Sequence, residues 1–240
     1  MSKIFFWNRE KQCEEEEKVM GQKSIEWLYQ RPLGKAINPL ITHPFISQIY
    51  GKYQSSKISQ KNIAPFIKEF NISHDDFDLK YNFDSFNDFF IRPFKKGRRN
   101  FVKGNNLPAF AEGRYLGWES MNSQNKYPIK GIHITLAELL NSDILAEEFC
   151  DGPLMIARLC PVDYHRFHFP DSGKIDYSYT VSGLLDSVNP IALKNKDKIF
   201  LKNQRTVTVF ESEHFGKLLL IDVGATCVGK IVQSYTSNTV

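Results

Sequence analysis

The pattern of apolar residues changes once along this chain, near Pro108, and this change constrains the fold more than any other feature of the sequence. From about Glu14 to Phe70, apolar residues recur at helical spacing. After Pro108, glycine and proline separate short runs rich in alternating and β-branched residues. Helices followed mostly by strands predict an α+β architecture rather than a doubly wound one. We expect short amphipathic helices and then a β-rich, mainly antiparallel domain, divided as residues 1–100 and 101–240.

Local signals mark the helices expected in the first half. The run Glu14 to Glu17 suits the first turn of a helix, where the helix dipole favours anions. Apolar residues between Ile25 and Tyr29 fall at helical spacing, and Arg31-Pro32 ends that stretch. Pro65 to Phe70 predicts another helix start. Pro44 opens a further helix, whose expected apolar face comprises Phe45, Ile46, Ile49 and Tyr50.

The second half contains one expected helix and three expected strands. Ile134 to Asn141 is predicted as a helix in which Thr135 caps the N-terminus and Glu138 completes a capping box. Phe94 to Val102, which is rich in lysine and arginine, is the expected linker or exposed loop. The strands are predicted over Lys174 to Val181, Arg205 to Phe210 and Lys217 to Val223.

Composition excludes several classes of protein. With 42% hydrophobic and 24% charged residues in a chain of 240, the sequence suits a globular protein and not a disordered one. No apolar stretch approaches the roughly 20 residues that cross a bilayer, and the N-terminus lacks the long apolar core of a signal peptide. We therefore expect neither an integral membrane protein nor one secreted by that route. The four cysteines form no CxxC pair, which argues against a disulfide framework or zinc knuckle and suits a reducing compartment.

Positive charge gathers in the first 100 residues, which hold 17 Lys and Arg against 12 Asp and Glu. A basic region can favour an anionic partner, such as lipid headgroups or nucleic acid, although a solvated mixed-charge surface is the more common outcome. Phe83 to Phe94 adds an aromatic run beside the basic residues of 95–99. That combination is typical of single-stranded nucleic-acid binding, and equally of buried aromatic rings beside a basic loop that meets anionic headgroups.

Two histidines, His165 and His168, stand three residues apart in the segment 158–173, where the chemistry of the sequence concentrates. Pro161 and Pro170 bracket them, so a long helix is not expected there. Three interpretations stay open on this local evidence: structural histidines in an aromatic core, metal ligands, or general acid–base residues. Metal binding would need further ligands, and no nearby cysteine or carboxylate has a recognised spacing. Histidine titrates near neutral pH without help, which suits acid–base catalysis.

Five sequence blocks follow one another along the chain: SFNDFFIRPFKKGRR at 85–99, AEG at 111–113, KGIHITLAELL at 130–140, PVDYHRFHFP at 161–170 and VGATCVGKI at 223–231. The most specific are YHRFH and FNDFFIR, whose joint occurrence in this order is hard to ascribe to chance. Together, and over nearly the whole chain, these blocks resemble the phosphatidylserine decarboxylases, which are pyruvoyl-dependent enzymes of phospholipid synthesis.

The resemblance implies a self-processing proenzyme that makes phosphatidylethanolamine from phosphatidylserine. In that family a serine in a Gly-Ser-Thr motif near the C-terminus attacks the preceding peptide carbonyl, and elimination from the resulting ester leaves a pyruvoyl group on the new N-terminus. This covalent cofactor, carried by a small C-terminal subunit, forms a Schiff base with the substrate amine and accepts electrons while carbon dioxide leaves. The implied location is peripheral, on the cytoplasmic side of the cell membrane. The N-terminal helices would lie at an anionic bilayer. No nucleic-acid partner is expected, and a homodimer is compatible with the resemblance.

The resemblance assigns roles to three residues. His168 matches the base that activates the processing serine, and His165 matches the histidine of the decarboxylation step, as proton donor to the carbanion. The third residue of the family is the aspartate of an Ala-Asp-Gly block, which orients the histidine as a triad acid would. That position is Glu112 in this sequence, and the added methylene matters, because a misplacement of about 1 Å can cost on the order of a hundredfold in rate. The alternative for Glu112 is an exposed turn carboxylate.

The Gly-Ser-Thr motif of the family is missing from residues 1–240. The pyruvoyl-forming serine is therefore expected beyond Val240, and these residues alone are expected to be inactive. The resemblance is compatible with a fragment, a truncated gene product, or a decayed relative that still binds anionic phospholipid. No metal site is expected. A soluble nucleic-acid-binding module that uses residues 83–99 is the less favoured alternative.

Overall fold

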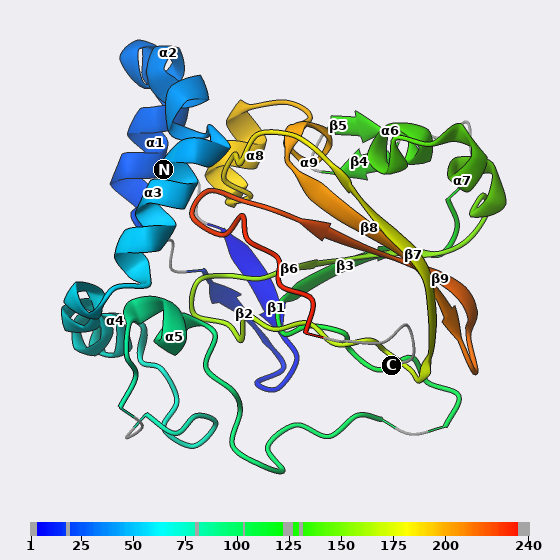
Figure 1. Ribbon diagram of the computed structural model, residues 1–240, viewed down its shortest axis with the longest axis horizontal. Coiled ribbons are helices and arrows are strands. Elements are labelled where there is room, and N and C mark those ends of the chain that lie inside the picture. Colours follow the sequence, from blue (N-terminus) through cyan, green and yellow to red (C-terminus); the bar gives the residue numbers. More distant parts are fainter. Residues whose placement is uncertain are drawn as a thin grey trace.

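Helices gather at one side of this molecule, and short antiparallel sheets make up most of the rest (Figure 1). The computed structural model describes residues 4–17, 20–79, 82–102, 104–121, 127–129 and 132–234. Every pairing between the named strands of these residues is antiparallel. The predicted α+β class is therefore confirmed.

An antiparallel hairpin precedes the helices, formed by β1 (Phe5–Asn8) and β2 (Cys13–Glu16). The prediction that Glu14 to Glu17 begin a helix is wrong, since most of that run is the second strand of the hairpin. A partner across the hairpin explains the difference: the Glu15 carboxylate accepts a hydrogen bond from the Asn8 side chain (Nδ2–Oε2, 2.6 Å). The helical pattern alone does not show such a cross-strand partner.

Helices then cover one side of the molecule. They are α1 (Gln22–Gln30), α2 (Pro32–Ile41), α3 (Pro44–Gln54), the 3-10 helix η1 (Lys57–Asn62), α4 (Ile63–Phe70) and α5 (Phe86–Phe90). The helix expected between Ile25 and Tyr29 is confirmed as α1, and it ends just before Pro32 opens the next helix. Pro44 opens α3 as predicted, where ring nitrogen Nδ1 of His43 caps the helix by accepting from the Phe45 amide (3.3 Å).

Within the described residues, three sheets follow helix α5. The largest has the strand order β7 (Gly173–Val181), β8 (Arg205–Ser212), β9 (Gly216–Val223), while β3 (Arg114–Trp118) pairs with β6 (Leu154–Arg158) and β4 (Tyr127–Ile129) pairs with β5 (Ile132–Ile134). The three strands predicted from the alternating runs are therefore confirmed as the three-stranded sheet.

Short helices lie between these strands, namely α6 (Leu136–Leu140), α7 (Asp143–Glu148), α8 (Pro190–Asn195) and α9 (Ile199–Lys202). The predicted capping box of α6 is confirmed. The Thr135 hydroxyl accepts from the Glu138 amide (3.2 Å), and the Glu138 carboxylate accepts from the Thr135 amide (3.1 Å). These two bonds satisfy backbone donors that the first turn would otherwise leave without partners.

The buried side chains form several clusters. Helices α6 and α7 pack on β8, where Val207 and Val209 are fully enclosed. On the helical side, an aromatic cluster brings together Phe66 of α4, Phe89 of α5 and Tyr164. Because Tyr164 belongs to the segment 158–173, this cluster packs helices α4 and α5 against the segment that contains His165 and His168.

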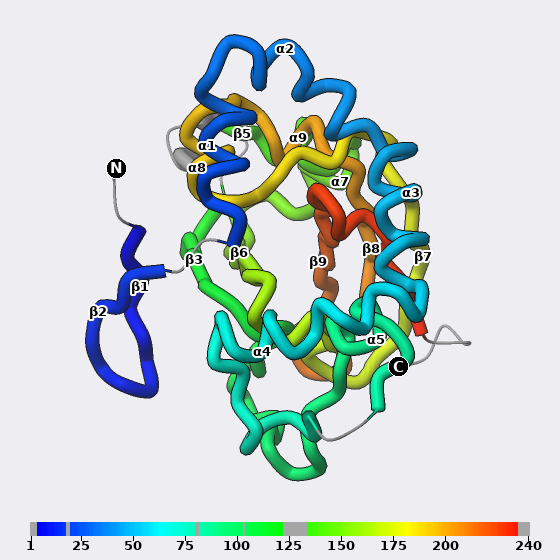
Figure 2. The backbone as a smooth tube through the Cα atoms, turned by 90° about the vertical axis from the view of Figure 1, so that its left-hand side faces the viewer, coloured from blue at the N-terminus to red at the C-terminus, as the bar shows by residue number. Residues whose placement is uncertain are grey.

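A buried polar network fastens the helices to the sheets. The Asp186 carboxylate, which is fully buried, accepts from the Tyr29 hydroxyl of α1 (3.1 Å) and pairs with Lys196 (2.6 Å). Lys196 also donates to the Asn38 side chain of α2 (2.8 Å). Because an unpaired buried charge is costly, these contacts hold α1 and α2 against α8 and its neighbours. Figure 2 shows α1 beside α8.

Candidate active site

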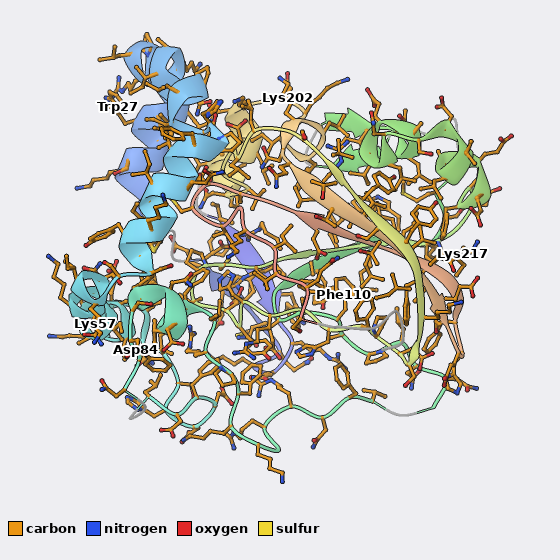
Figure 3. All side chains as sticks on the ribbon, in the orientation of Figure 1. Trp27, Lys57, Asp84, Phe110, Lys202 and Lys217 are labelled. Atoms are coloured by element: carbon orange, nitrogen blue, oxygen red, sulfur yellow. The ribbon has the colours of Figure 1, made fainter. Side chains whose placement is uncertain are left out.

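A large groove with mainly apolar walls runs between the helices and the sheets, with a volume of about 2700 Å³. Its walls come from α3, from the β3–β6 pair and from β9, and Figure 2 shows β3 and β6 facing β9 across the molecule. Pockets for small molecules measure about 300–1,000 Å³, so a small ligand alone would leave much of this groove empty. Both histidines line the groove, as does Phe110, which is labelled in Figure 3.

The histidine segment has an irregular backbone, in agreement with the expectation that no long helix forms there. An isolated antiparallel bridge joins Ala111 to Phe167, and the His168 amide donates to the Phe110 carbonyl (2.7 Å). These contacts place the AEG block directly beside the YHRFH block. The fold thus brings together two of the blocks that carry the family resemblance.

His165 is held by a backbone carbonyl and an aromatic ring. Its Nε2 lies 2.9 Å from the Cys160 carbonyl oxygen, and its ring stacks on Phe90 with a centroid separation of 3.9 Å. A carbonyl oxygen only accepts, so Nε2 carries the proton and Nδ1 carries the lone pair. Burial lowers the pKa of His165 to about 4, which keeps the ring neutral at pH 7.

His168 lies in a more open position. Its ring stacks parallel to Tyr164 at 5.7 Å and meets the edge of Phe101 at 5.6 Å. Burial, and then the positive charge of Arg166, lower the pKa of His168 below its ordinary value. The neutral ring that results at pH 7 is able to accept a proton.

Glu112 follows Ala111, which pairs with Phe167 beside His168, but its carboxylate binds an arginine and not a histidine. Its carboxylate accepts a hydrogen bond from Arg99 Nε (2.8 Å) and is well exposed. Within the described parts of the chain, no hydrogen bond joins Glu112 to His165 or to His168. The structure therefore places all three predicted residues in one region, while the carboxylate pairs with an arginine.

The FNDFFIR block packs directly on the histidine segment. Helix α5 is capped by Ser85, whose hydroxyl accepts from the Asp88 amide (3.1 Å). Phe90 stacks on His165, and the buried Arg92 donates to the Val162 carbonyl (Nη2–O, 2.9 Å). The joint occurrence of the two blocks thus has a physical basis, because each supports the other.

The aromatic residues of 83–94 are largely withdrawn from solvent. Phe83 and Phe89 are buried, and Phe94 stacks on Tyr164 at 4.2 Å. Rings that pack in this way are not available for base stacking. The structure favours buried aromatics beside a basic loop over a nucleic-acid-binding surface.

The VGAT block closes the end of the groove nearest β9. A Cβ atom at Gly224 or Gly229 would lie within 2.8 Å or 2.4 Å of the Leu185 side chain. The Asn203 side chain donates to the Gly224 carbonyl (2.7 Å), and the Thr226 hydroxyl donates to the Leu185 carbonyl. The two glycines of this block therefore allow close packing against Leu185.

Sequence reasoning assigned no chemistry to Asp222, Arg166 or Glu17, although all three line the groove. Asp222 lies in β9, within the strand predicted over Lys217 to Val223, and burial raises the pKa of its carboxyl to about 6. In the sequence, the feature that could have pointed to Asp222 is its position as the single acidic residue in the apolar run 218–223. Arg166 donates through Nε to the Ile91 carbonyl (2.8 Å), and Glu17 pairs with an arginine 141 positions later. Contacts over such separations leave no local signal.

In the described ranges, no group of three or more His, Cys, Asp and Glu side chains is placed to hold a metal ion. None of the helices in those ranges is long and apolar enough to cross a membrane.

Comparison with known proteins identifies the family. A sequence model of the family described as phosphatidylserine decarboxylase matches residues 86–240. The phosphatidylserine decarboxylase proenzyme of Clostridium novyi (strain NT) is 43% identical over 241 residues, which cover 99% of this chain and 81% of that protein. The proenzymes of Clostridium beijerinckii and Clostridium botulinum (strain Hall) are 43% and 40% identical, over 97% and 98% of this chain and 80% and 81% of their own lengths. This chain belongs to the phosphatidylserine decarboxylase family, a family of carboxy-lyases.

Proposed function

We propose that this chain is the larger part of an enzyme that decarboxylates phosphatidylserine to phosphatidylethanolamine. The observation that carries the proposal is the placement of His165 and His168 in one groove, the first enclosed and the second open. Two histidines in different surroundings suit two different proton transfers, as the self-processing and decarboxylation steps require.

The groove fits a pyruvoyl-bearing segment and a lipid headgroup together. Residues 1–240 contain no Gly-Ser-Thr sequence, so the group would come from a C-terminal segment outside them. Aligned relatives are longer, since this chain covers 81% of the Clostridium novyi protein. The mainly apolar walls and the volume of about 2700 Å³ offer space for such a segment. When present, the pyruvoyl carbonyl supplies the electron-accepting group for loss of carbon dioxide.

In this proposal the two histidines divide the work. His168 is neutral at pH 7 and open to the groove, so it is suited to take the proton from the processing serine. His165 is neutral, fixed at Nε2 by the Cys160 carbonyl and pressed against Phe90. Since the Nε2 proton is bound to the Cys160 carbonyl, the atom that can carry a proton to the reacting carbon is Nδ1, which first takes that proton from water in the groove.

Arg166 supports a substrate of negative charge. Its Nε is anchored on the Ile91 carbonyl, and the side chain is exposed at the groove between the two histidines. A guanidinium group held in this way suits the phosphate or carboxylate of the serine headgroup. We assign Arg166 to headgroup binding within the same proposal.

A peripheral position on an anionic membrane completes the proposal. Four apolar side chains of α3 are exposed, at 59% for Phe45, 36% for Ile46, 52% for Ile49 and 41% for Tyr50. An apolar helix face of this kind can lie in a bilayer surface. The first 100 residues carry a net positive charge, which favours anionic lipid.

The decisive experiment is to read the gene in frame past the codon for Val240 and to express the whole reading frame. We expect a Gly-Ser-Thr sequence, cleavage into two chains, and release of carbon dioxide from phosphatidylserine in vesicles. His168→Asn should block cleavage, whereas His165→Asn should permit cleavage and abolish decarboxylation. A reading frame that lacks the motif, or a cleaved product without activity, would contradict the proposal.

A second candidate function is that of an inactive relative that still binds anionic phospholipid. The pairing of Glu112 with Arg99, rather than with a histidine, favours it. This candidate predicts binding to phosphatidylserine vesicles without cleavage or carbon dioxide release from the whole reading frame.

A further inference from the structure

A charge-balanced cluster lies behind His165, and the family resemblance assigned no role to any of its members. We call it the Glu17 network. It comprises Glu17, Arg114, Arg158, Cys160 and Asp163. Glu17 follows the N-terminal hairpin, Arg114 begins β3 and Arg158 ends β6, so three separate parts of the chain meet here. Two carboxylates face two guanidinium groups, and the side chain of Glu17 is 4% exposed.

The charged members are paired by direct contacts. Arg158 binds Glu17 through both terminal nitrogens, with Nη1–Oε1 at 3.0 Å. Arg114 binds Asp163, with Nη1–Oδ1 at 2.7 Å, and also lies 4.5 Å from the centre of the Phe6 ring. Burial raises the pKa of Glu17, but hydrogen bonds from Arg158 and Cys160 outweigh it and leave the pKa below its ordinary value. The cluster is therefore ionised and internally neutral at pH 7.

Every polar group of Cys160 is held by this network or by His165. The Cys160 amide donates to Asp163 (N–Oδ2, 2.6 Å), and its thiol donates to Glu17 (Sγ–Oε1, 3.0 Å). Its carbonyl accepts from the Asp163 amide (2.9 Å) and from His165 Nε2 (2.9 Å). The direction of this carbonyl fixes which nitrogen of His165 carries the proton.

We propose that Glu17 and Asp163 are positioning residues, which set the tautomer and ring orientation of His165 through the Cys160 peptide group. The catalytic role of His165 rests on the proposed function, whereas the contacts that orient its ring do not depend on that function. A carboxylate that orients a histidine through an intervening acceptor acts as an outer support for that ring. The arrangement also makes the N-terminal hairpin a structural support of the groove.

The test is the protonation pattern of His165, read by nitrogen-15 NMR of histidine-labelled protein spanning residues 1–240. In the wild type we expect a neutral ring with the proton on Nε2 at pH 7 and a pKa far below 6.5. Asp163→Asn and Glu17→Gln should populate the Nδ1-protonated form. They should also lower the pKa of His165 further, because the contact with the Cys160 carbonyl favours the protonated ring and each lost carboxylate leaves an arginine without its counter-charge, beside the positive charge of Arg92. The His168 signals should stay unchanged in both variants.

Matched variants separate positioning from general stability. Glu138→Gln removes a carboxylate that pairs with Lys198 (2.9 Å) on α6, and it should leave His165 as in the wild type. Cys160→Ala removes the thiol without stranding a buried charge, so it should fold and give a partial shift of the same kind. Asp163→Glu should restore more of the wild-type pattern than Asp163→Asn.

The proposal is overturned if wild-type His165 carries its proton on Nδ1, or if Cys160→Ala and the folded network variants leave its tautomer and pKa unchanged. These readouts need no turnover. The NMR result can therefore contradict the positioning role while the decarboxylase function stands, and a lack of decarboxylase activity would leave the NMR result valid.

Discussion

At the scale of single residues, burial sets the charge state of the groups in the groove. His165 and Asp222 both line it, and burial favours the neutral form of each side chain because the charged form loses its hydration. It lowers the pKa of His165 to about 4 and raises the pKa of Asp222 to about 6. The two shifts affect stability with opposite sign over the same acidic range.

Asp222 makes the fold less stable at neutral pH. Its folded pKa of about 6 exceeds the unfolded value of 3.8, so its ionised form destabilises the fold above pH 6 and the penalty disappears as pH falls toward 4. Asp222→Asn should raise the free energy of unfolding by about 3 kcal/mol at pH 7 and by less than about 1 kcal/mol at pH 4. Urea denaturation at both pH values measures the difference. Equal stabilisation at both would contradict the burial of this carboxyl.

His165 has the opposite effect. Its folded pKa of about 4 lies below the unfolded 6.5, so the unfolded chain takes the proton first and stability is lost as pH falls from 6.5 to 4. His165→Phe keeps a ring beside Phe90 and removes the titration. Between pH 7 and pH 4 this variant should lose about 3 kcal/mol less of its unfolding free energy than the wild type. His74→Phe, at an exposed histidine, should follow the wild-type urea curve; a matching gain there would refute the assignment.

At the scale of elements, α5 and the histidine segment behave as one unit. A helix of five residues is too short to be stable alone, so α5 depends on its contacts. Arg92, just after α5, supplies several contacts: its guanidinium donates to the Val162 carbonyl and lies 4.2 Å and 4.7 Å from the ring centres of Phe77 and Phe89. Burial lowers the pKa of Arg92 to about 10, and the side chain remains charged at pH 7.

Arg92→Lys tests whether the planar guanidinium is needed. Lysine keeps the charge, but it lacks the flat fork that reaches the carbonyls of Phe89 and Val162 while stacking on rings. We expect a loss of about 1–3 kcal/mol in unfolding free energy, since a buried carbonyl is left without its donor. Arg98→Lys changes an exposed arginine of the following loop and should cost much less. Urea titration compares the two, and equal losses would argue against this role for Arg92.

The sequence predicts those elements whose causes are local. Pro44 fixes the start of α3, alternation reveals β7 to β9, and the Thr135–Glu138 pair marks α6. The run Glu14 to Glu17 misleads, because Glu15 bonds to Asn8 across a hairpin and Glu17 pairs with Arg158 on another part of the chain.

The residues of the candidate site also divide into those that the sequence identifies and those whose surroundings depend on the folded chain. Motifs identify His165 and His168, because their spacing and flanking residues are visible in the sequence. The pairing of Glu112 with Arg99 depends on two loops that meet only in the folded chain. The burial of Asp222 depends equally on what packs around β9.

At the scale of the whole molecule, apolar surface remains uncovered on the helical side. Trp27, labelled in Figure 3, lies there with Leu33 and Leu40, of which the last two are 65% and 66% exposed. Large exposed apolar patches mark interaction surfaces. The outer helices are therefore the face that we expect to meet the bilayer.

Ile49→Ser tests this assignment. Burial of an isoleucine side chain contributes about 1.5–3 kcal/mol, so its loss should weaken partition into phosphatidylserine vesicles at least about tenfold. Ile144→Ser is the matched control, since Ile144 is 80% exposed on α7, at the opposite side of Figure 1 from α3. Vesicle co-sedimentation measures both variants. A similar loss for the two, or none for Ile49→Ser, would rule out the α3 face.

The ion pair between Glu17 and Arg158 also fixes an order of events during synthesis. Glu17 leaves the ribosome early, whereas its partner is added 141 residues later. At about 5–20 residues per second, translation keeps the hairpin waiting on the order of 7–28 s for that partner. The hairpin is therefore made well before the contact that locks it in place.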